Sequence, residues 1–555
     1  MSARRRVVRG LVVLAGLAAV LVGVVGWRAS GIIKGLLRNW AVETVAQQSG
    51  GVYRLDLGRV RLNWLLRRMT MDSVRLTTNV GANAKRVPPL LDLGVAFDRC
   101  TVSGVHLVPL VLGHGFAAGS FTCRRGSVAI SGISRPGGPA LPPVPTPAAA
   151  PRPPASVPRV RIARVDISNL ALDVRFPYAG GGETRFALER ARWTMADFAI
   201  DPADSAAASR PLFSRAAELA ADSFVVRPDS FTAFRVAHLR ASLTDSTFDA
   251  ARLAFAPSVP MAEFERRGSF PPDVILISGA HVRMQGVDFG ALALGSGLLA
   301  RRLTVDSLHV KISSDARVPI RDSRHRTPQQ FIVDLGQTVH VDSVVMHQGE
   351  VEYRELDADQ AGPGVLTFSH IEATVAPVSH VDGRQTRGDS MIFVATSELL
   401  KAGRLDVRIG MPLDAPTFEM AFGGTLGPMP ATGFNQVIER LDNWRIIRGQ
   451  VVGISFGAAV HHGVARGTLT PRYTGLSIEI TGHGSTGILG AHGIFGGAAR
   501  GLASMIARSQ VNSDNPGQAK VPRRGPITHV FAPSETLPAF LWFSLREGLL
   551  AVLKK

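Results

Sequence analysis

The stretch that decides the fold is 303–312, which reads Leu-Thr-Val-Asp-Ser-Leu-His-Val-Lys-Ile. Its second half alternates between apolar and polar residues, and side chains two positions apart lie on the same face of a strand. One face therefore carries three apolar side chains, Leu308, Val310 and Ile312. The other face carries His309 and Lys311. This pattern predicts a strand with one apolar face and one face in water.

The decisive stretch contains a phrase that recurs along the chain. The order apolar, any residue, apolar, Asp, Ser, apolar, any residue, apolar occurs at 69–76, 219–226, 303–310 and 339–346, which predicts a repeated structural unit. In each copy the apolar positions change parity across Asp-Ser, so an uninterrupted strand would turn its buried face to solvent. A β-bulge at Asp-Ser would restore the face, and a two-residue hairpin turn is the alternative. We favour the bulge, because such turns prefer Asn-Gly or Asp-Gly, and we expect this Asp and Ser to be structural rather than catalytic.

Most of the chain around these copies also reads as strands. Runs with alternation or β-branched residues end at Gly, Pro, Asp or Asn, and the clearest are 159–176, 184–200, 234–255, 273–284, 303–312, 339–353 and 365–375. Few helix-length patterns lie between them, so the sequence predicts a mostly β chain with an antiparallel, meandering sheet. Short helices are expected at 261–267 and 435–444.

Length and charge restrict the class of protein. The chain has 555 residues and a formal net charge of +18, which comes almost wholly from Arg. This length exceeds what a single core normally holds, so several domains or one extended architecture are expected. The positive charge either attracts anionic partners or reflects a biased composition. No stretch interleaves basic and aromatic residues for base stacking, so we expect no nucleic-acid partner and favour anionic lipid headgroups.

The N-terminus combines a basic cluster with an apolar run. Four arginines among residues 4–9 precede the uncharged residues 10–27. A run of about 18 residues crosses most of a bilayer as a helix, so we expect a transmembrane anchor at 10–27 and a cytoplasmic tail at 1–9. Because basic residues stay in the cytoplasm, the rest of the chain is expected in the periplasm of a bacterium, held at the inner membrane. A cleaved signal peptide is the alternative, but no clear A-x-A motif closes the run.

The chain has two cysteines, Cys100 and Cys123. In an oxidising compartment they could form a disulfide between neighbouring strands, and two free buried cysteines are the alternative. No Cys-x-x-Cys motif occurs, and the adjacent His461 and His462 would point to opposite faces of a strand. We therefore expect no metal site and no cofactor.

Two short motifs match enzyme signatures. Gly453–Gly457 fits G-x-S-x-G with Ser455 as the nucleophile, but that motif needs a helix directly after the serine, and the sequel reads as strand and turn. Gly482–Gly487 fits G-x-G-x-x-G, but neither a βαβ unit nor an acidic residue about 20 positions further on accompanies it. We assign no catalytic residue and expect a protein that is not an enzyme.

Composition divides the chain into segments. Residues 135–158 are rich in Pro and Ala, cannot pair in a sheet, and are expected to form an extended linker. This tract separates an expected N-terminal β-rich unit, 28–134, from a main β domain, 159–480. Residues 481–535 read as Gly-rich and irregular. Residues 536–555 read as an amphipathic helix, which either lies on a membrane surface or packs on the last strands.

Several segments together resemble AsmA-like proteins of the bacterial envelope. They are the expected anchor followed by 52–64, the phrase LTVDSLHVKI with DARVP after it, the run VDSVVMHQGEVEYRE at 341–355, the segment GGTLGPMPATGFNQVIERLDNWRIIRGQV at 423–451, and Asn515-Pro516 before LPAFLWFSLREGLLAVL at 537–553. The resemblance covers most of the chain. It lies in the character of these segments and in their order along the chain, and not in an invariant catalytic motif. It is that of a divergent member, since the Pro-rich tract departs from the pattern.

The resemblance implies a fold and a function. It implies an elongated, curved antiparallel sheet whose concave side is an apolar groove, with Leu308, Val310 and Ile312 among the residues that line it. It also implies that phospholipid moves along this groove in envelope biogenesis, with the inner membrane and other envelope or outer-membrane proteins as partners. An anchored assembly or scaffolding factor that conducts no lipid is the alternative function.

Overall fold

The protein is described by a computed structural model. The described residues are 42, 45–46, 49–63, 67–85, 92–106, 116–131, 159–178, 182–201, 213–227, 231–258, 273–293, 297–315, 338–356, 363–380, 390–413, 415, 417–441, 444–480, 511–518, 520–532 and 535–554.

The described chain is mostly β, as the sequence predicts. Its 22 described strands belong to one mixed hydrogen-bonded sheet, and its described helices are few. The chain divides into two compact units. Unit 1 is Met1–Arg252 with Gln285–Gly297, and unit 2 is Leu253–Met284 with Leu298–Lys555. The division falls within strands β10 (Thr247–Pro257) and β11 (Asp273–Gln285).

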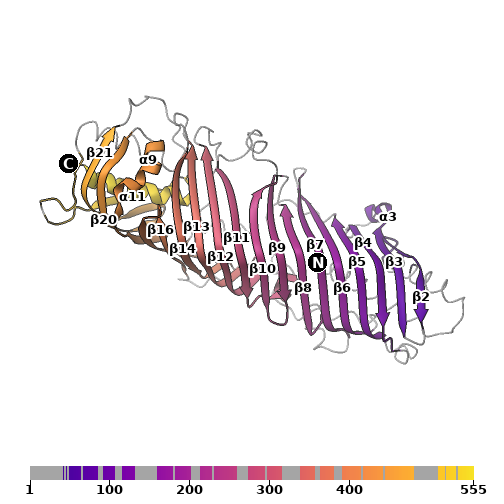
Figure 1. Ribbon diagram of the computed structural model, residues 1–555. Coiled ribbons are helices and arrows are strands. Elements are labelled where there is room, and N and C mark those ends of the chain that lie inside the picture. Colours follow the sequence, from indigo (N-terminus) through magenta and orange to yellow (C-terminus); the bar gives the residue numbers. More distant parts are fainter. Residues whose placement is uncertain are drawn as a thin grey trace. The chain divides into compact units, whose positions relative to one another are not determined.

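Unit 1 begins with strands whose alternation is plain in the sequence. In β1, for example, Tyr53, Leu55 and Leu57 are buried while Arg54 and Asp56 between them are more exposed. Figure 1 shows the strands of this unit from indigo to magenta. Its elements are β1 (Tyr53–Leu57), β2 (Val60–Asn63), β3 (Arg68–Thr78), α3 (Val80–Ala84), β4 (Asp92–Ser103), β5 (Phe116–Ser131), β6 (Val160–Tyr178), β7 (Gly182–Ile200), β8 (Ala216–Arg227), β9 (Thr232–Ser242) and α7 (Phe289–Ala293).

Unit 2 contains the longest described helix. Its elements are β12 (Leu298–Asp315), β13 (Val339–Leu356), β14 (Gly364–Ala376), β15 (Val378–His380), β16 (Ser390–Leu399), β17 (Gly403–Pro412), β18 (Met420–Leu426), β19 (Met429–Pro430), η2 (Ala431–Phe434), α9 (Asn435–Leu441), β20 (Trp444–His461), β21 (Val464–Ile480), β22 (Gly525–Val530) and α11 (Leu537–Leu553).

The prediction of a purely antiparallel sheet is wrong. Strand β5 pairs with β6 in parallel, and β12 pairs with β13 in parallel. Both pairs are joined by long connections, 132–159 and 316–338, and a parallel pair needs a connection of a dozen or more residues. A chain that returns to the same end of the sheet before it re-enters makes its next strand parallel.

The Pro-rich tract 135–158 lies outside the described residues, but the strands on either side of it are neighbours. Phe116 in β5 is opposite Val160 in β6, and the pairing continues along both strands within unit 1. The tract therefore joins two adjacent strands of unit 1, which continues to Arg252.

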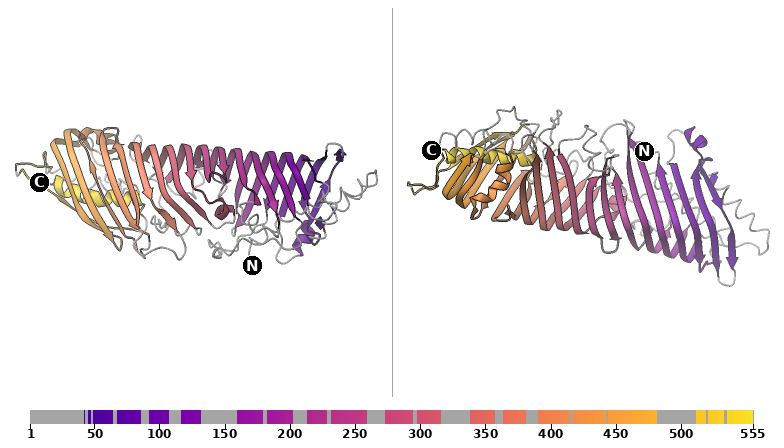
Figure 2. Two further views of the ribbon diagram at one scale, coloured as in Figure 1. Left: turned by 90° about the horizontal axis from the view of Figure 1, so that it is seen from below. Right: turned by 45° about the horizontal axis from the view of Figure 1, so that its top comes forward.

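Helix α11 packs on the sheet of unit 2. Thr536 caps its N-terminus by accepting a hydrogen bond from the Ala539 N–H, and Phe540 and Ser544 on one side of the helix are fully buried. The helix lies along β21 and β22, and the right-hand view of Figure 2 shows it in yellow across the orange strands. Of the two positions expected for the C-terminal helix, the structure has the one packed on the last strands.

The expected anchor at 10–27 and the short helix expected at 261–267 lie outside the described residues. Among the helices that the structure does describe, none has the length and apolarity needed to cross a bilayer. The other expected short helix is present as α9.

Candidate functional site

The apolar face of β12 is continuous across Asp306-Ser307. Val305 is buried before this step, and Leu308, Val310 and Ile312 are half-buried after it. Ser307 has φ +50°, a left-handed conformation in the middle of a strand. One such residue changes which face the following side chains occupy, so Val305 and Leu308 share a face although they are three positions apart.

Strand β11 gives independent evidence for this shared face. A Cβ atom built on Gly279 would lie 3.1 Å from Val305 Cγ1 and 3.3 Å from Leu308 Cδ1. It would also lie 3.3 Å from Leu253 Cγ on β10. Both β12 side chains therefore meet one point of β11, where a side chain larger than that of Gly279 would be crowded.

The same change of parity occurs in β3. Met69 and Met71 are buried before Asp72-Ser73, Leu76 is buried after it, and Ser73 has φ +59°. The register with β4 is the same on both sides, since Asp72 is opposite Arg99 and Val74 is opposite Phe97. The hairpin alternative is wrong here, because β3 and β12 run through Asp-Ser. The face is restored as predicted, but a single left-handed residue restores it without an extra residue in the β3–β4 ladder.

Left-handed residues also stand opposite one another on paired strands. In the parallel pair of unit 1, the register places Arg125 (φ +50°) opposite Asn169 (φ +54°). In unit 2, it places Ser307 opposite Gln348 (φ +52°). Neighbouring strands thus change parity at the same level, which keeps the apolar side chains of both on one face.

The other two copies of the phrase differ from this arrangement. Neither Ser223 nor Ser343 is among the residues with positive φ. In β13 the left-handed residue is Gln348, and the register with β14 shifts on both sides of Gly349, as at a bulge. In β8, Asp222 is opposite the left-handed His238 of β9. In β3, β8 and β12, the Asp-Ser of the repeated phrase lies at or directly opposite a left-handed residue. In β13, the left-handed Gln348 lies five positions after Ser343.

The three residues expected to line a groove lie on the apolar face of unit 2. Val310 is opposite Val351 on β13, and Ile312 is opposite the buried Tyr353. Ile312 packs at the margin of a buried cluster that contains Tyr353, Leu426, Met429 and Val552. Their half-buried state leaves part of each side chain accessible.

The polar face of the same strands carries ion pairs. His309 Nδ1 lies 3.3 Å from a Glu350 carboxylate oxygen, and Lys311 Nζ lies 3.6 Å from Glu352. Desolvation raises the pKa of the Glu352 carboxyl, but its hydrogen bond and charge interactions with Arg354 and Lys311 outweigh this and leave the pKa below its usual range. Such half-exposed pairs contribute little to stability, so this face is a solvated surface.

Towards the C-terminus the apolar face of unit 2 is a closed core. Helix α11 contributes Phe540 to one cluster with Met420 and Ile527, and Val552 to a second with Met429. The helix approaches β22 so closely that a Cβ on Gly525 would lie within contact of the Gly548 backbone. Strands β21 and β22 are thereby covered on this face.

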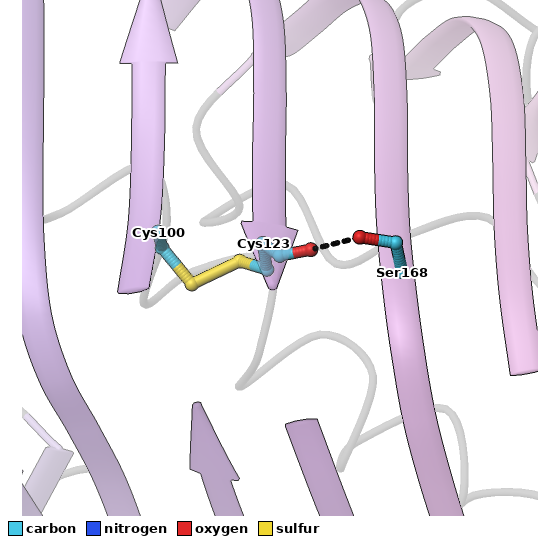
Figure 3. Close-up of a disulfide and its surroundings, with 3 residues drawn as sticks. All are labelled: Cys100, Cys123 and Ser168. Atoms are coloured by element: carbon cyan, nitrogen blue, oxygen red, sulfur yellow. Dashed lines mark hydrogen bonds between the residues drawn. A yellow bond between two sulfur atoms is a disulfide. The ribbon is translucent and has the colours of Figure 1, made fainter. Parts of the chain in front are cut away.

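Unit 1 contains its own buried cluster, and the two cysteines are part of it. Cys100 and Cys123 are directly opposite on β4 and β5 and form a disulfide, with Cα atoms 4.2 Å apart (Figure 3). That spacing fits the closer of the two kinds of antiparallel pair. Ser168 on β6 donates a hydrogen bond to the Cys123 carbonyl oxygen at 3.5 Å. The disulfide lies on the apolar face beside Met71 and Val102.

The serine of the G-x-S-x-G motif lies within a strand of the sheet. Ser455 lies inside the continuous strand β20, opposite Thr470, with no helix after it, so the nucleophile-elbow geometry does not occur at this serine. Gly482–Gly487 lies outside the described residues. No group of three or more His, Cys, Asp or Glu side chains in the described ranges is arranged to hold a metal ion.

His461 and His462 meet a partner that sequence reasoning missed. His462 and Gly463 both have positive φ and form the two-residue turn between β20 and β21. Glu419 accepts hydrogen bonds from the His462 N–H and the Thr417 hydroxyl, and it contacts His461 Nδ1 at 2.9 Å. These hydrogen bonds lower the pKa of Glu419 to about 2, the largest contribution coming from the His462 N–H. Glu419 and its hydrogen-bond partners thus stabilise the hairpin turn between β20 and β21.

No protein-family model matches the chain, and a search of curated proteins finds no match.

Proposed function

We propose that this chain is a membrane-anchored, AsmA-like protein of the bacterial envelope that binds phospholipid along the apolar face of its sheet. The observation that carries the proposal is the single apolar face, maintained where left-handed residues such as Ser73 and Ser307 correct the side-chain parity. On β12 and β13 this face keeps partly accessible apolar side chains aligned across neighbouring strands, and such a surface suits an apolar ligand.

The chemistry of such a site is that of an apolar surface for acyl chains. Removing apolar surface from water gives about 0.8 kcal/mol per buried CH2 group, so an acyl chain that buries about ten methylenes along the face gains about 8 kcal/mol. The headgroup stays in water and needs no partner in the protein. Binding therefore requires no nucleophile, metal or cofactor, and movement along the face is passive, with direction and energy supplied elsewhere.

The closed core limits where lipid can bind in unit 2. Helix α11 covers β21 and β22, and α9 packs against β14 and β20. The proposed site in unit 2 therefore lies on β12 and β13, where Leu308, Val310 and Val351 are half-buried.

The test is whether lipid accompanies the protein. The full chain is purified in mild detergent, and bound phospholipid is extracted and counted per protein by mass spectrometry. We expect at least one phospholipid per chain, and fewer with Val310→Glu, because a carboxylate would meet acyl chains with no partner. The matched control is Lys311→Gln on the opposite face of β12. A folded protein that holds no phospholipid in excess of a control membrane protein would contradict the proposal and favour the scaffolding function.

A further inference from the structure

Positive charge is concentrated in the first strands of unit 1. The described residues between 49 and 131 contain ten Lys and Arg side chains against four Asp and no Glu. The described residues between 338 and 480 contain nine Lys and Arg against ten Asp and Glu. A compositional bias of the whole chain would raise the ratio of basic to acidic side chains in both regions alike. The excess of basic side chains in β1 to β5 is therefore a local feature.

The excess lies on the polar face of these strands. Arg75, Arg99 and Arg124 are exposed, and each is next to a buried residue that points to the other face. Arg99 on β4 is directly opposite Arg124 on β5. The adjacent pair in this register is Cys100 and Cys123, so the disulfide on the apolar face holds the two arginines beside each other on the polar face.

Acidic residues compensate only part of this charge. Asp72 bonds to both Arg61 and Arg99, at 3.0 Å and 2.8 Å, and the hydrogen bond from Arg99 is the main reason that its pKa lies below the usual range. Within the described residues, no carboxylate lies within ion-pair distance of Arg68, Arg75 or Arg124. Like charges directly opposite on a sheet repel, so this face favours an external anion.

We propose that the polar face of β3 to β5 docks on the surface of a bilayer that contains anionic phospholipid. Guanidinium groups form paired hydrogen bonds with phosphate, and a cluster of them is attracted to an anionic leaflet. The inference rests on the proposed function in one respect: the expected anchor at 10–27 would keep this face close to the membrane, because only the 21 residues 28–48 separate Trp27 from the described segment 49–63.

Arginine modification tests the docking directly. The full chain is reconstituted in nanodiscs of phosphatidylcholine, with or without phosphatidylglycerol, and treated with phenylglyoxal. We expect Arg68, Arg75 and Arg124 to react several-fold more slowly in the anionic discs, and this protection to disappear in about 0.5 M salt because the charges are exposed. Arg235 and Arg240 on β9 are exposed arginines of the same unit and should react equally in both discs. Equal reaction of Arg68, Arg75 and Arg124 in both discs would overturn the proposal.

A pair of double variants separates docking from general attraction. Arg75→Gln with Arg124→Gln should abolish the protection of Arg68, while Arg235→Gln with Arg240→Gln should leave it unchanged. Protection that both double variants reduce equally would show diffuse adsorption and contradict a patch on β3 to β5. The anchor is scored separately, by incorporation into phosphatidylcholine discs. If incorporation fails, binding of the chain to anionic but not neutral vesicles still tests the patch.

Discussion

Because Ser307 has a left-handed conformation, replacing it by Val should destabilise the protein, whereas the same substitution in an ordinary strand should stabilise it. In a regular strand, Ser→Val is favourable, because β-branched residues pack well on a pleated surface, and the scale of such effects spans about 1 kcal/mol. At φ +50°, a residue with a Cβ is strained by roughly 1–2 kcal/mol, and a β-branched residue is the least tolerated. Ser307→Val should therefore lower the local free energy of unfolding by about 1–2 kcal/mol, whereas Ser307→Gly should not.

Hydrogen exchange on peptides from β12 and β13 is the suitable assay, because the two units need not unfold together. A loss of about 1–2 kcal/mol corresponds to about 5- to 30-fold faster exchange of these amides. The control is Ser313→Val, the same substitution in the same strand at a residue without positive φ. If Ser307→Val slowed exchange as much as the control, Ser307 would be ordinary strand. Val305 and Leu308 would then lie on opposite faces, and the single apolar face would be refuted.

Three further predictions follow from other parts of the structure. Replacing Cys100 and Cys123 by Ser should lower the free energy of unfolding of unit 1 by about 3 kcal/mol, as expected for a cross-link spanning 23 residues. Denaturation of the wild-type chain with and without reductant should show the same loss, and an unchanged midpoint would count against the disulfide. Because the folded pKa of Glu419 is depressed from 4.5 to about 2, its stabilising effect is present above about pH 4.5 and is lost as the pH falls towards 2. The difference in urea midpoint between wild type and Glu419→Gln should therefore shrink from pH 6 to pH 3, and a constant difference would show that the carboxylate contributes nothing through its charge. Phe540→Ala empties a fully buried site beneath α11 and should cost about 3–5 kcal/mol, whereas a loss under 1 kcal/mol in urea unfolding would mean that the helix is not part of the core.

Local patterns predicted much of the strand content and the face on which Leu308, Val310 and Ile312 lie. The parity change at Asp-Ser was also predictable, because apolar residues on both sides must reach one face. The device was not. The left-handed positions are occupied by Ser73, Ser307 and Gln348 rather than by glycine, so the usual sequence signal for positive φ is missing.

Long-range pairing explains what the sequence could not predict. Parallel neighbours at β5–β6 and β12–β13 depend on where the connections 132–159 and 316–338 return, which local alternation does not encode. Glu419 meets His461 and His462 only because β18 pairs with β20. The arginine-rich face likewise depends on register, since Arg99 and Arg124 are 25 positions apart and become neighbours through the β4–β5 pairing.

The central claim is that acyl chains lie on one face of the sheet, and site-specific photocrosslinking in living cells tests it most directly. A benzophenone side chain is placed at Val310 in one variant and at His309, on the opposite face of β12, in the other. We predict phospholipid adducts at 310, detected by mass spectrometry of the purified chain, and few or none at 309. Equal adducts at both positions, or no adduct at 310 in a folded protein, would contradict the account.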